Sequence, residues 1–469
     1  QLASPDGFCG VAKFLRCRRC QTRTKAHRMP SHPLAVHNFR VYWIARLCAT
    51  LAQMAMVIVI GWQVYDLARE TMSIKEASFQ LGLIGLAQFL PLLALSLFAG
   101  WVADRIDRRW IARASVALEA GCALTLAWLT WTGTISLPAL FAIAALLGVA
   151  RAFAGPALQA LAPNLVPLAL LPTAIALSSM SWQVGVVIGP AMGGYLYAAA
   201  DWLAYAVSGG LFLISLLLLF LISPVARTAT RKDRNPWLQM IDGLHYVRRN
   251  RLVLGAISLD LFAVLLGGAT AMLPVYARDI LHIGADGLGH LRAAPALGAV
   301  ITATAFSWRP LRTEVGRKML WSVAAFGLAT VVFGLAGPGL TWMIGPSATG
   351  SDLSPAVLLS LAALFALGAA DMVSVYVRQS LIQLYTPDDM RGRVGAVATL
   401  FVSGSNELGE AESGFLAALI GPVAAVVGGG IGAILVTMLW ARIFPELPRA
   451  RTFDVPDSHD IAPAEPKSG

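Results

Sequence analysis

The amino-acid sequence predicts an all-α membrane protein in which twelve transmembrane helices form two pseudo-repeats of six. Three observations carry this prediction: an apolar composition, long apolar runs that recur along the whole chain, and one polar segment that divides those runs evenly. Of the 469 residues, 57% are hydrophobic and 13% are charged, whereas soluble domains carry about 25% charged residues. Since about 20 apolar residues suffice to cross a bilayer core as a helix, we expect the chain to cross the membrane many times.

Each predicted span corresponds to one apolar run. Six runs precede the polar segment and six follow it, and they lie at 41–65, 81–103, 111–131, 137–156, 173–198, 202–222, 252–276, 288–308, 319–336, 355–376, 394–416 and 420–440. The two sets are expected to form an N-terminal bundle, 39–222, and a C-terminal bundle, 252–440. Charged connections and proline-containing connections recur in the same order in both halves, as duplication of a six-helix unit predicts.

The remaining segments are polar. A basic leader, 1–38, and a cytoplasmic tail, 441–469, are expected to be disordered. Within the central segment, 223–251, the stretch from Pro236 to Arg249 spaces apolar residues like one face of a helix. This spacing predicts an amphipathic helix along the inner membrane face, and a plain linker is the alternative. The cysteines of the leader include one C-x2-C spacing without a second pair, so no metal site is predicted.

The charge of the connections predicts the orientation. If the leader is cytoplasmic, 31 of the 36 Lys and Arg residues fall on the cytoplasmic side, with Arg151 and Arg378 counted in connections. Arg69, Lys75 and Arg278 fall outside, and the other two lie within spans. Because cytoplasmic connections of membrane proteins are rich in Lys and Arg, we expect a multi-pass membrane protein with both termini in the cytoplasm. The net charge of +10 is explained by these connections, and no nucleic-acid partner is predicted.

One connection carries a dense cluster of charge. Residues 100–110 read GWVADRIDRRW and resemble the loop between helices 2 and 3 of the major facilitator superfamily, G-x3-D-R-x-G-R-R. Asp107 stands where that family has glycine, and the matching positions are Gly100, Asp104, Arg105, Arg108 and Arg109. The resemblance covers about residues 35–445 and implies a transporter whose halves expose a central cavity to each side in turn.

The same resemblance implies a gate at this loop. Asp104 is expected to form charge-assisted hydrogen bonds with the start of a helix in the other half. That start is expected at 386–389, with Thr386 as N-cap and Pro387 in the first turn. Such a latch would close the cytoplasmic side while the cavity faces outward. The alternative is structural, because a cluster of charges also keeps a tight turn out of the lipid.

A glycine-rich run lies in the predicted fifth span. The segment GVVIGPAMGG resembles the antiporter signature of the superfamily, which implies export, and it matches at Gly185, Gly189, Pro190, Gly193 and Gly194. Glycines four residues apart share a helix face and allow another helix to approach closely. Ala176 replaces the first glycine of the signature, and ordinary small-residue packing is the alternative.

Ionisable side chains within the spans are costly to bury, so they are candidates for proton coupling or for lining the cavity. The candidates are Arg151, Asp260, Arg292, Asp371, Glu407 and Glu410, with Glu119 as a further acid. Glu407 and Glu410 are three residues apart and share a helix face, which favours proton binding by the pair, and Arg292 could pair with either. Arg151 begins a match to the family's R-x3-G element. A snorkelling arginine and a structural ion pair are the alternatives.

Shorter segments narrow the resemblance. The resemblance extends to one branch of the superfamily, the enterobactin exporters and macrolide-efflux proteins, through the segments GWQVYDL, GLAQFLP, YTPDDMRGRV and GEAESG. This implies an exporter of siderophores, drugs or similar amphiphiles in the bacterial inner membrane. The buried carboxylates and the missing ATP site favour the proton gradient as its energy source, and we expect a monomer that needs no cofactor. A proton-coupled importer of a small metabolite is the main alternative, and a non-transporting sensor is a further one. No lysine follows a glycine, so the phosphate-binding loop of an ATP-driven pump is missing, and no catalytic motif predicts an enzyme.

Overall fold

The computed structural model describes residues 32–167, 170–223, 236–309, 311, 313–345, 354–387 and 390–450. Its first bundle contains α1 (His37–Thr71), α2 (Ile74–Arg105), α3 (Arg108–Trp131), α4 (Leu137–Leu161), α5 (Leu171–Ala199) and α6 (Leu203–Leu221). Its second bundle contains α8 (Arg251–Leu266), α9 (Leu273–Val275), the π-helical turn η4 (Tyr276–Ile280), α10 (Gly284–Trp308), α11 (Val315–Ile344), α12 (Pro355–Tyr385), α13 (Arg391–Ile420) and α14 (Pro422–Ile443). The described residues contain no strand, in agreement with the predicted all-α class.

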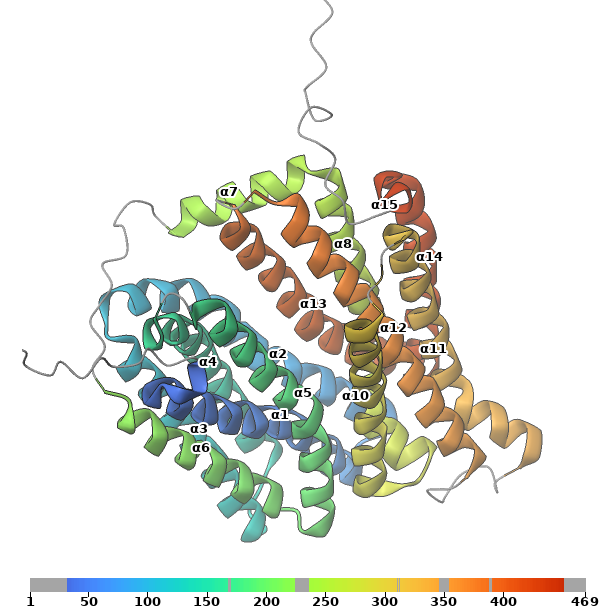
Figure 1. The fold of residues 1–469 in the computed structure, drawn as a ribbon. Coiled ribbons are helices and arrows are strands. Elements are labelled where there is room, and N and C mark those ends of the chain that lie inside the picture. Colours follow the sequence, from blue (N-terminus) through green and yellow to red (C-terminus); the bar gives the residue numbers. More distant parts are fainter. Residues whose placement is uncertain are drawn as a thin grey trace, which may run out of the picture.

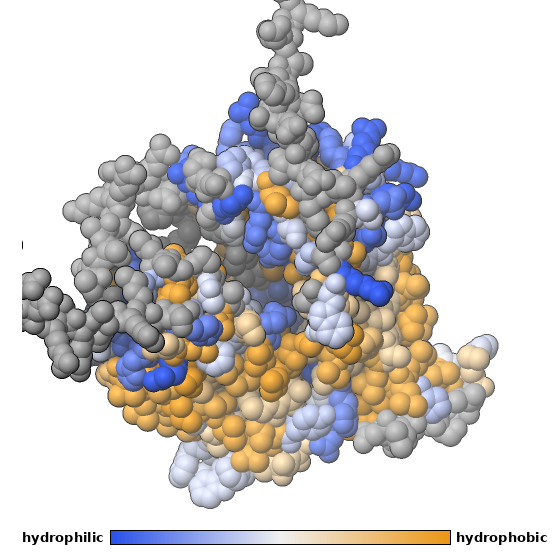
Figure 2. Space-filling view, viewed as in Figure 1, coloured by the Kyte–Doolittle hydropathy of each residue, from blue (hydrophilic) through white to orange (hydrophobic). Residues whose placement is uncertain are grey.

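Nine helices in the described part of the chain are long and apolar enough to cross a membrane. They are α1 to α6, α11, α12 and α14. The other three predicted spans are also helical, but they are shorter or carry more charge. Large apolar side chains lie exposed on the outside of the bundles, and Figure 2 shows broad hydrophobic surface there. A surface of this kind is what contact with lipid requires.

The predicted seventh span is interrupted, which corrects the continuous helix expected at 252–276. α8 ends at Leu266 with Gly267 as its C-cap, and helical structure resumes only at Leu273. A side chain at Gly267 would approach the ring of Phe326 to 2.5 Å, so only glycine fits against α11 at this point. Each of the two consecutive glycines also weakens a helix by about 0.5–1 kcal/mol relative to alanine.

The expected disordered leader, 1–38, and tail, 441–469, each include residues that are helical in the structure. The 3-10 helix η1 (Pro33–Ala35) and the start of α1 fall within the expected leader. α14 continues to Ile443, and the short helix α15 (Glu446–Arg449) follows it. Leu447 is fully buried, and the backbone N–H of Gly316 donates to the carbonyl of Ala450 at 3.0 Å. The rest of both segments, 1–31 and 451–469, lies outside the described residues.

The two bundles meet at one end and diverge toward the end that carries α7 (Pro236–Arg249) (Figure 1). We call this the α7 end, and we call the opposite end, with the connections at 72–73, 281–283 and 421, the far end. Across the interface α2 packs against α13, and α5 packs against α10. Figure 2 shows the molecule hollowed between the bundles, with hydrophilic residues in the hollow.

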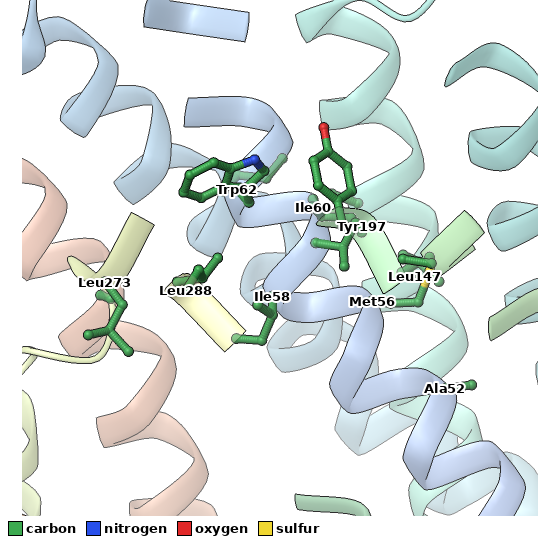
Figure 3. Close-up of a cluster of buried hydrophobic side chains, with 14 of the residues drawn as sticks. Ala52, Met56, Ile58, Ile60, Trp62, Leu147, Tyr197, Leu273 and Leu288 are labelled. Atoms are coloured by element: carbon green, nitrogen blue, oxygen red, sulfur yellow. The ribbon is translucent and has the colours of Figure 1, made fainter. Parts of the chain in front are cut away.

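An apolar core joins the bundles near the far end. Figure 3 shows Leu288 of α10 beside Ile58 of α1, with Trp62 of α1 and Leu273 of α9 on that side of α1. All four belong to one cluster of buried side chains that extends through both bundles. Burial of apolar surface contributes about 25 cal/mol per Å², so this shared core favours contact between the bundles at the far end.

The predicted amphipathic helix is present as α7, with the expected bounds. Val247 is buried in a cluster with apolar residues of α8, α12 and α13. The Tyr246 hydroxyl donates to the carbonyl of Tyr385 at 2.5 Å, and Asp242 pairs with Arg393 at 3.3 Å. One side of α7 is therefore fixed to the second bundle. Other side chains of α7, such as Leu244, remain exposed.

Candidate functional site

An ion pair connects the bundles between their two ends. Nη2 of Arg151 on α4 donates to Oε1 of Glu407 on α13 at 3.0 Å, and both side chains are 16% exposed. The charge count of the sequence analysis treated Arg151 as a connection residue although the predicted span 137–156 contains it; the structure places it inside α4, which continues for ten more residues, to Leu161. The buried acid Glu119 of α3 also lies within electrostatic range of Arg151. Arg151 therefore has one acid in the other bundle and one in its own.

A second pair of opposite charges lies beside the first. Arg292 of α10 interacts electrostatically with Glu410 of α13, and its Nε is buried without a hydrogen-bond partner. Glu410 also contacts the surface of α2 at Gly85 and lies within range of Arg151. We call Arg151, Arg292, Glu407 and Glu410 the central charge cluster. Two arginines and two acids from three helices thus gather where the bundles meet.

The candidate Asp260 belongs to a different place, inside the second bundle. It forms an ion pair with Arg378 of α12, and both side chains are 5% exposed. The sequence analysis counted Arg378 in a connection and missed this pair, because α12 continues to Tyr385. A signal was present in the sequence: Asp371, Ser374 and Arg378 are spaced as one helix face. Asp371 and Asp260 line the same small cavity.

Ion pairs between the bundles also close the far end. Arg69 of α1 pairs with Asp279 of η4 at 2.9 Å, and the Tyr65 hydroxyl donates to the same carboxylate at 2.6 Å. Arg278 pairs with Asp66, and its Nη1 donates to the Asp66 carbonyl at 2.7 Å. We call these five residues the far-end clasp. The sequence analysis counted both arginines only as cations outside the membrane and did not predict the clasp.

The electrostatics of Asp279 favour its charged form. Burial acts to raise the pKa of its carboxyl, but the hydrogen bonds from Arg69 and Tyr65 outweigh burial, and the pKa lies below its usual value. A carboxylate with a lowered pKa keeps its partners at neutral pH and loses them only in acid. The clasp is therefore held at neutral pH.

At the α7 end, the predicted gating loop is only partly described. α2 continues through Gly100, Asp104 and Arg105, whose side chains lie outside the described part of the structure. α3 begins at Arg108, and its N-cap is Asp107, which accepts from the backbone N–H of Arg109 at 3.0 Å. Arg109 also pairs with Asp107 at 2.6 Å. The acid that replaces the family's glycine thus caps the next helix.

The expected partner of the loop is built differently from the prediction. Thr386 is the C-cap of α12 rather than an N-cap, and its buried Oγ1 has no hydrogen-bond partner among the residues that the structure describes. α13 begins at Arg391, and the carbonyl of Pro387 accepts from the N–H groups of Met390 and Arg391 at 2.9 and 3.0 Å. This turn moves the start of the helix beyond the expected position. Residues 388–389 lie outside the described residues, so the latch itself stays a prediction.

The glycine run of α5 faces two neighbours. Gly185, Gly189 and Gly193 lie against α1, where a Cβ at Gly193 would approach the carbonyl oxygen of Ala55 to 2.9 Å. Gly194 faces α10 of the other bundle, where its Cβ would approach the Cα of Gly289 to 2.8 Å. The run includes Pro190, inside the helix. It therefore brings α5 close both to its own bundle and to the opposite one.

Comparison with protein families gives a match over most of the chain. The model of the Major Facilitator Superfamily matches residues 42–410. The enterobactin exporter EntS of Citrobacter koseri is 26% identical over 430 residues, which cover 90% of this chain and 94% of that protein. EntS of Escherichia coli O1:K1 has the same identity and coverage.

Solved structures share the fold. A D-xylose-proton symporter has a TM-score of 0.65 at 13% identity and covers 88% of this chain and 98% of its own. A bacterial homologue of the lysosomal transporter Spinster, inward-facing and occupied, has a TM-score of 0.64 at 13% identity, with 89% and 99% covered. A bacterial homologue of ferroportin in an inward-facing state has a TM-score of 0.60 at 16% identity, with 86% and 98% covered.

Proposed function

This chain belongs to the Major Facilitator Superfamily, and on that premise we propose that it is a proton-coupled exporter of small amphiphilic molecules that works by alternating access. It is a transporter and not an enzyme, and it is a multi-pass protein of the bacterial inner membrane. The α7 end would face the cytoplasm, because the connections at that end carry most of the Lys and Arg residues.

The observation that carries this proposal is the cross-bundle pair of Arg151 and Glu407. It lies between a far end held by the clasp and an α7 end where the bundles diverge (Figure 1). Charged groups within a membrane are costly and are usually found where a transport pathway or a proton relay needs them. A charge pair that must break when the bundles separate can couple protonation to movement.

We infer the following sequence of events at the central charge cluster. A proton that reaches Glu407 removes its negative charge and weakens its bond to Arg151. Arg151 then keeps a partner in its own bundle, Glu119, so that its charge is not left alone. Glu410, on the same helix as Glu407, and Arg292 of α10 would respond in the same way. The interface between the bundles thereby loses its central connection and can rearrange around bound substrate.

The proposed substrate class comes from two features. The relatives named as enterobactin exporters match nearly their whole length, which favours a siderophore or a similar amphiphile. The hollow between the bundles contains hydrophilic residues (Figure 2), and both signs of charge meet in the central charge cluster. A polar, partly anionic molecule with aromatic groups would find arginines to bind there.

The proposal is tested by transport into everted membrane vesicles with an imposed pH gradient, acidic inside. An enterobactin-type catecholate siderophore and a hydrophobic drug are offered, and both accumulation and proton release are recorded. The wild type is expected to accumulate at least one of them and to release protons as it does so. Glu407→Gln and Glu410→Gln should lose the dependence on the pH gradient, while Glu446→Gln, at the exposed pair with Arg251, serves as the matched control.

Two results would contradict the proposal. Accumulation without proton release would indicate a facilitator rather than an antiporter. Unchanged dependence on the pH gradient in both glutamine variants would remove the central charge cluster from the coupling mechanism.

A further inference from the structure

We propose that a cavity inside the second bundle binds one monovalent cation, a sodium ion or a proton, with Asp371 as its charged ligand. The cavity is lined by α8, α11 and α12, at Asp260, Ala263, Val264, Val323, Phe326, Ala370, Asp371 and Ser374. Its residues come from the second bundle alone, so the site is separate from the central charge cluster. The inference goes beyond the proposed function, and its test does not depend on transport.

The spacing of residues on α12 builds the polar side of the cavity. Asp371, Ser374 and Arg378 are three and four residues apart, so they lie along one face of the helix. Asp260 of α8 lies opposite and pairs with Arg378. The other lining residues are apolar, among them Val323 and Phe326 of α11. The polar groups are thus concentrated in a mostly apolar surrounding.

The charges around the cavity do not balance. Arg378 neutralises Asp260, and Asp371 has no ion pair or hydrogen bond among the described residues. Arg292, on the neighbouring helix α10, acts on Glu410 instead. One carboxylate therefore remains without a cation. An unpaired charge in the interior of a membrane protein is costly, so it either takes up a proton or binds an ion.

An independent observation also points to a ligand. Ser374 is 3% exposed and lines the cavity, and within the described part of the chain its Oγ has no hydrogen-bond partner. A buried hydroxyl is normally hydrogen-bonded, so an unsatisfied one indicates a partner such as an ion or a water. The space suits a single water-sized species. Carboxylate and hydroxyl oxygens are suitable ligands for a hard cation. Asp371 is partly exposed, which leaves a way in.

The experiment measures thermal unfolding of the purified full-length protein by tryptophan fluorescence. Sodium chloride is compared with choline chloride at constant ionic strength, at pH 8 and at pH 5.5. If the ion is sodium, it should raise the Tm of the wild type at pH 8 by about 2–4 °C at saturation. If the ion is a proton, the Tm should instead rise by a similar amount between pH 8 and pH 5.5 without sodium.

Variants assign the response to the cavity. Asp371→Asn should abolish whichever response the wild type shows, whereas Asp286→Asn, at an exposed position on α10, should keep it. Ser374→Ala retains the carboxylate and should raise the half-saturating sodium concentration, or shift the pH midpoint, several-fold. This variant keeps the test informative if Asp371→Asn does not fold. Glu407→Gln should retain the full sodium response, because it lies outside the cavity.

The proposal is overturned if the wild-type Tm responds to neither sodium nor pH, or if Asp371→Asn responds like the wild type. A protein that fails the vesicle assay but shows the cation response would contradict the proposed export alone. A protein that exports but lacks the response would contradict the cation site alone.

Discussion

The two ends of the interface between the bundles are built from different kinds of interaction. At the far end, ion pairs and close glycine contacts run from one bundle to the other, as in Arg69–Asp279 and Gly82–Gly414. At the α7 end, the pairs Asp107–Arg109 and Asp242–Arg393 each connect residues of one half only. The far end is therefore fixed by contacts that must break, while these two ion pairs at the α7 end stabilise their own halves.

The ion pairs of the far-end clasp set how strongly the protein favours the state in which the far end is closed. Partly exposed ion pairs contribute about 0.2–1 kcal/mol each, so the two pairs of the clasp together contribute on the order of 1 kcal/mol. A change of 1.4 kcal/mol shifts a two-state equilibrium tenfold. The clasp is strong enough to favour one state and weak enough for substrate or proton binding to reverse it.

The largest expected effect concerns the pair that joins the bundles at their centre. Glu407→Gln removes the negative charge that binds Arg151 across the interface and leaves Arg151 with the acid of its own bundle, Glu119. We expect transport in the vesicle assay to fall at least tenfold, with normal amounts of protein in the membrane. Transport within twofold of the Glu446→Gln control would show that this pair is structural.

The next effect concerns the contact of α2 with α13. A side chain at Gly414 would overlap the backbone of Gly82, so Gly414→Ala should force the far end apart. The reporter is Ser78→Cys, a position that is fully buried in this interface. An impermeant thiol reagent applied from the far side should modify it several-fold faster in the Gly414→Ala background. Gly404→Ala on the same helix, where a Cβ has free space, should leave the rate unchanged.

A smaller effect is expected from the far-end clasp. Asp279→Asn removes the charge that Arg69 binds and should speed modification of the Ser78→Cys reporter about two- to fivefold. Tyr65→Phe removes one hydrogen bond from the same carboxylate and should give part of that change. If the Ser78→Cys reporter is modified at the same rate with and without Asp279→Asn, the far end is held by apolar and glycine contacts alone.

The clasp should also respond to acid in a defined direction. The pKa of Asp279 lies below its usual value, so its contribution is complete at neutral pH and is lost as the pH falls through that lowered pKa. The rate at which the reagent modifies any cysteine falls as the pH falls because the thiolate is the reactive form, so the Ser78→Cys reporter is compared at each pH with and without Asp279→Asn. The ratio of the two rates should be constant from pH 8 to pH 5 and approach one only at more acidic pH. A change in this ratio near pH 6–7 would assign the response to another group.

The smallest effect is expected at the α7 end. Asp242→Asn breaks a partly exposed pair that lies within one half, and Val247 and Tyr246 still fix α7 to the second bundle. We expect transport to change by less than twofold. A larger loss would mean that α7 takes part in the movement of the bundles and is more than a brace.

The sequence predicted the fold well because lipid contact demands long apolar runs, and these can be read directly. It failed where a helix extends beyond its apolar part: Arg378 lies past the predicted span 355–376 but inside α12, and it pairs with the buried acid Asp260. Arg151 was counted among the cations of the connections although its predicted span contains it, and its partner Glu407 was not foreseen. The break after Leu266 had a local signal, the consecutive glycines 267 and 268, which the sequence analysis did not use. The contact of Gly267 with α11 depends on packing and could not be predicted.

Pairing across the interface was also beyond the sequence. Glu407 and Glu410 were identified from their spacing, but their partners lie on α4 and α10 and depend on how the bundles meet. The far-end clasp joins residues more than 200 positions apart, at 69 and 279. The predicted inner latch involves Asp104, whose side chain lies outside the described residues, and it stays a prediction.

The most direct test of alternating access is a pair of distances measured by double electron-electron resonance. Spin labels replace Ile106 and Leu384 at the α7 end, and Thr71 and Asp286 at the far end, all exposed positions, after the five native cysteines have been substituted. When a transported substrate is added and the pH is lowered, the α7-end distance should shorten while the far-end distance lengthens. If the two distances change in the same direction, or neither changes, the account is contradicted.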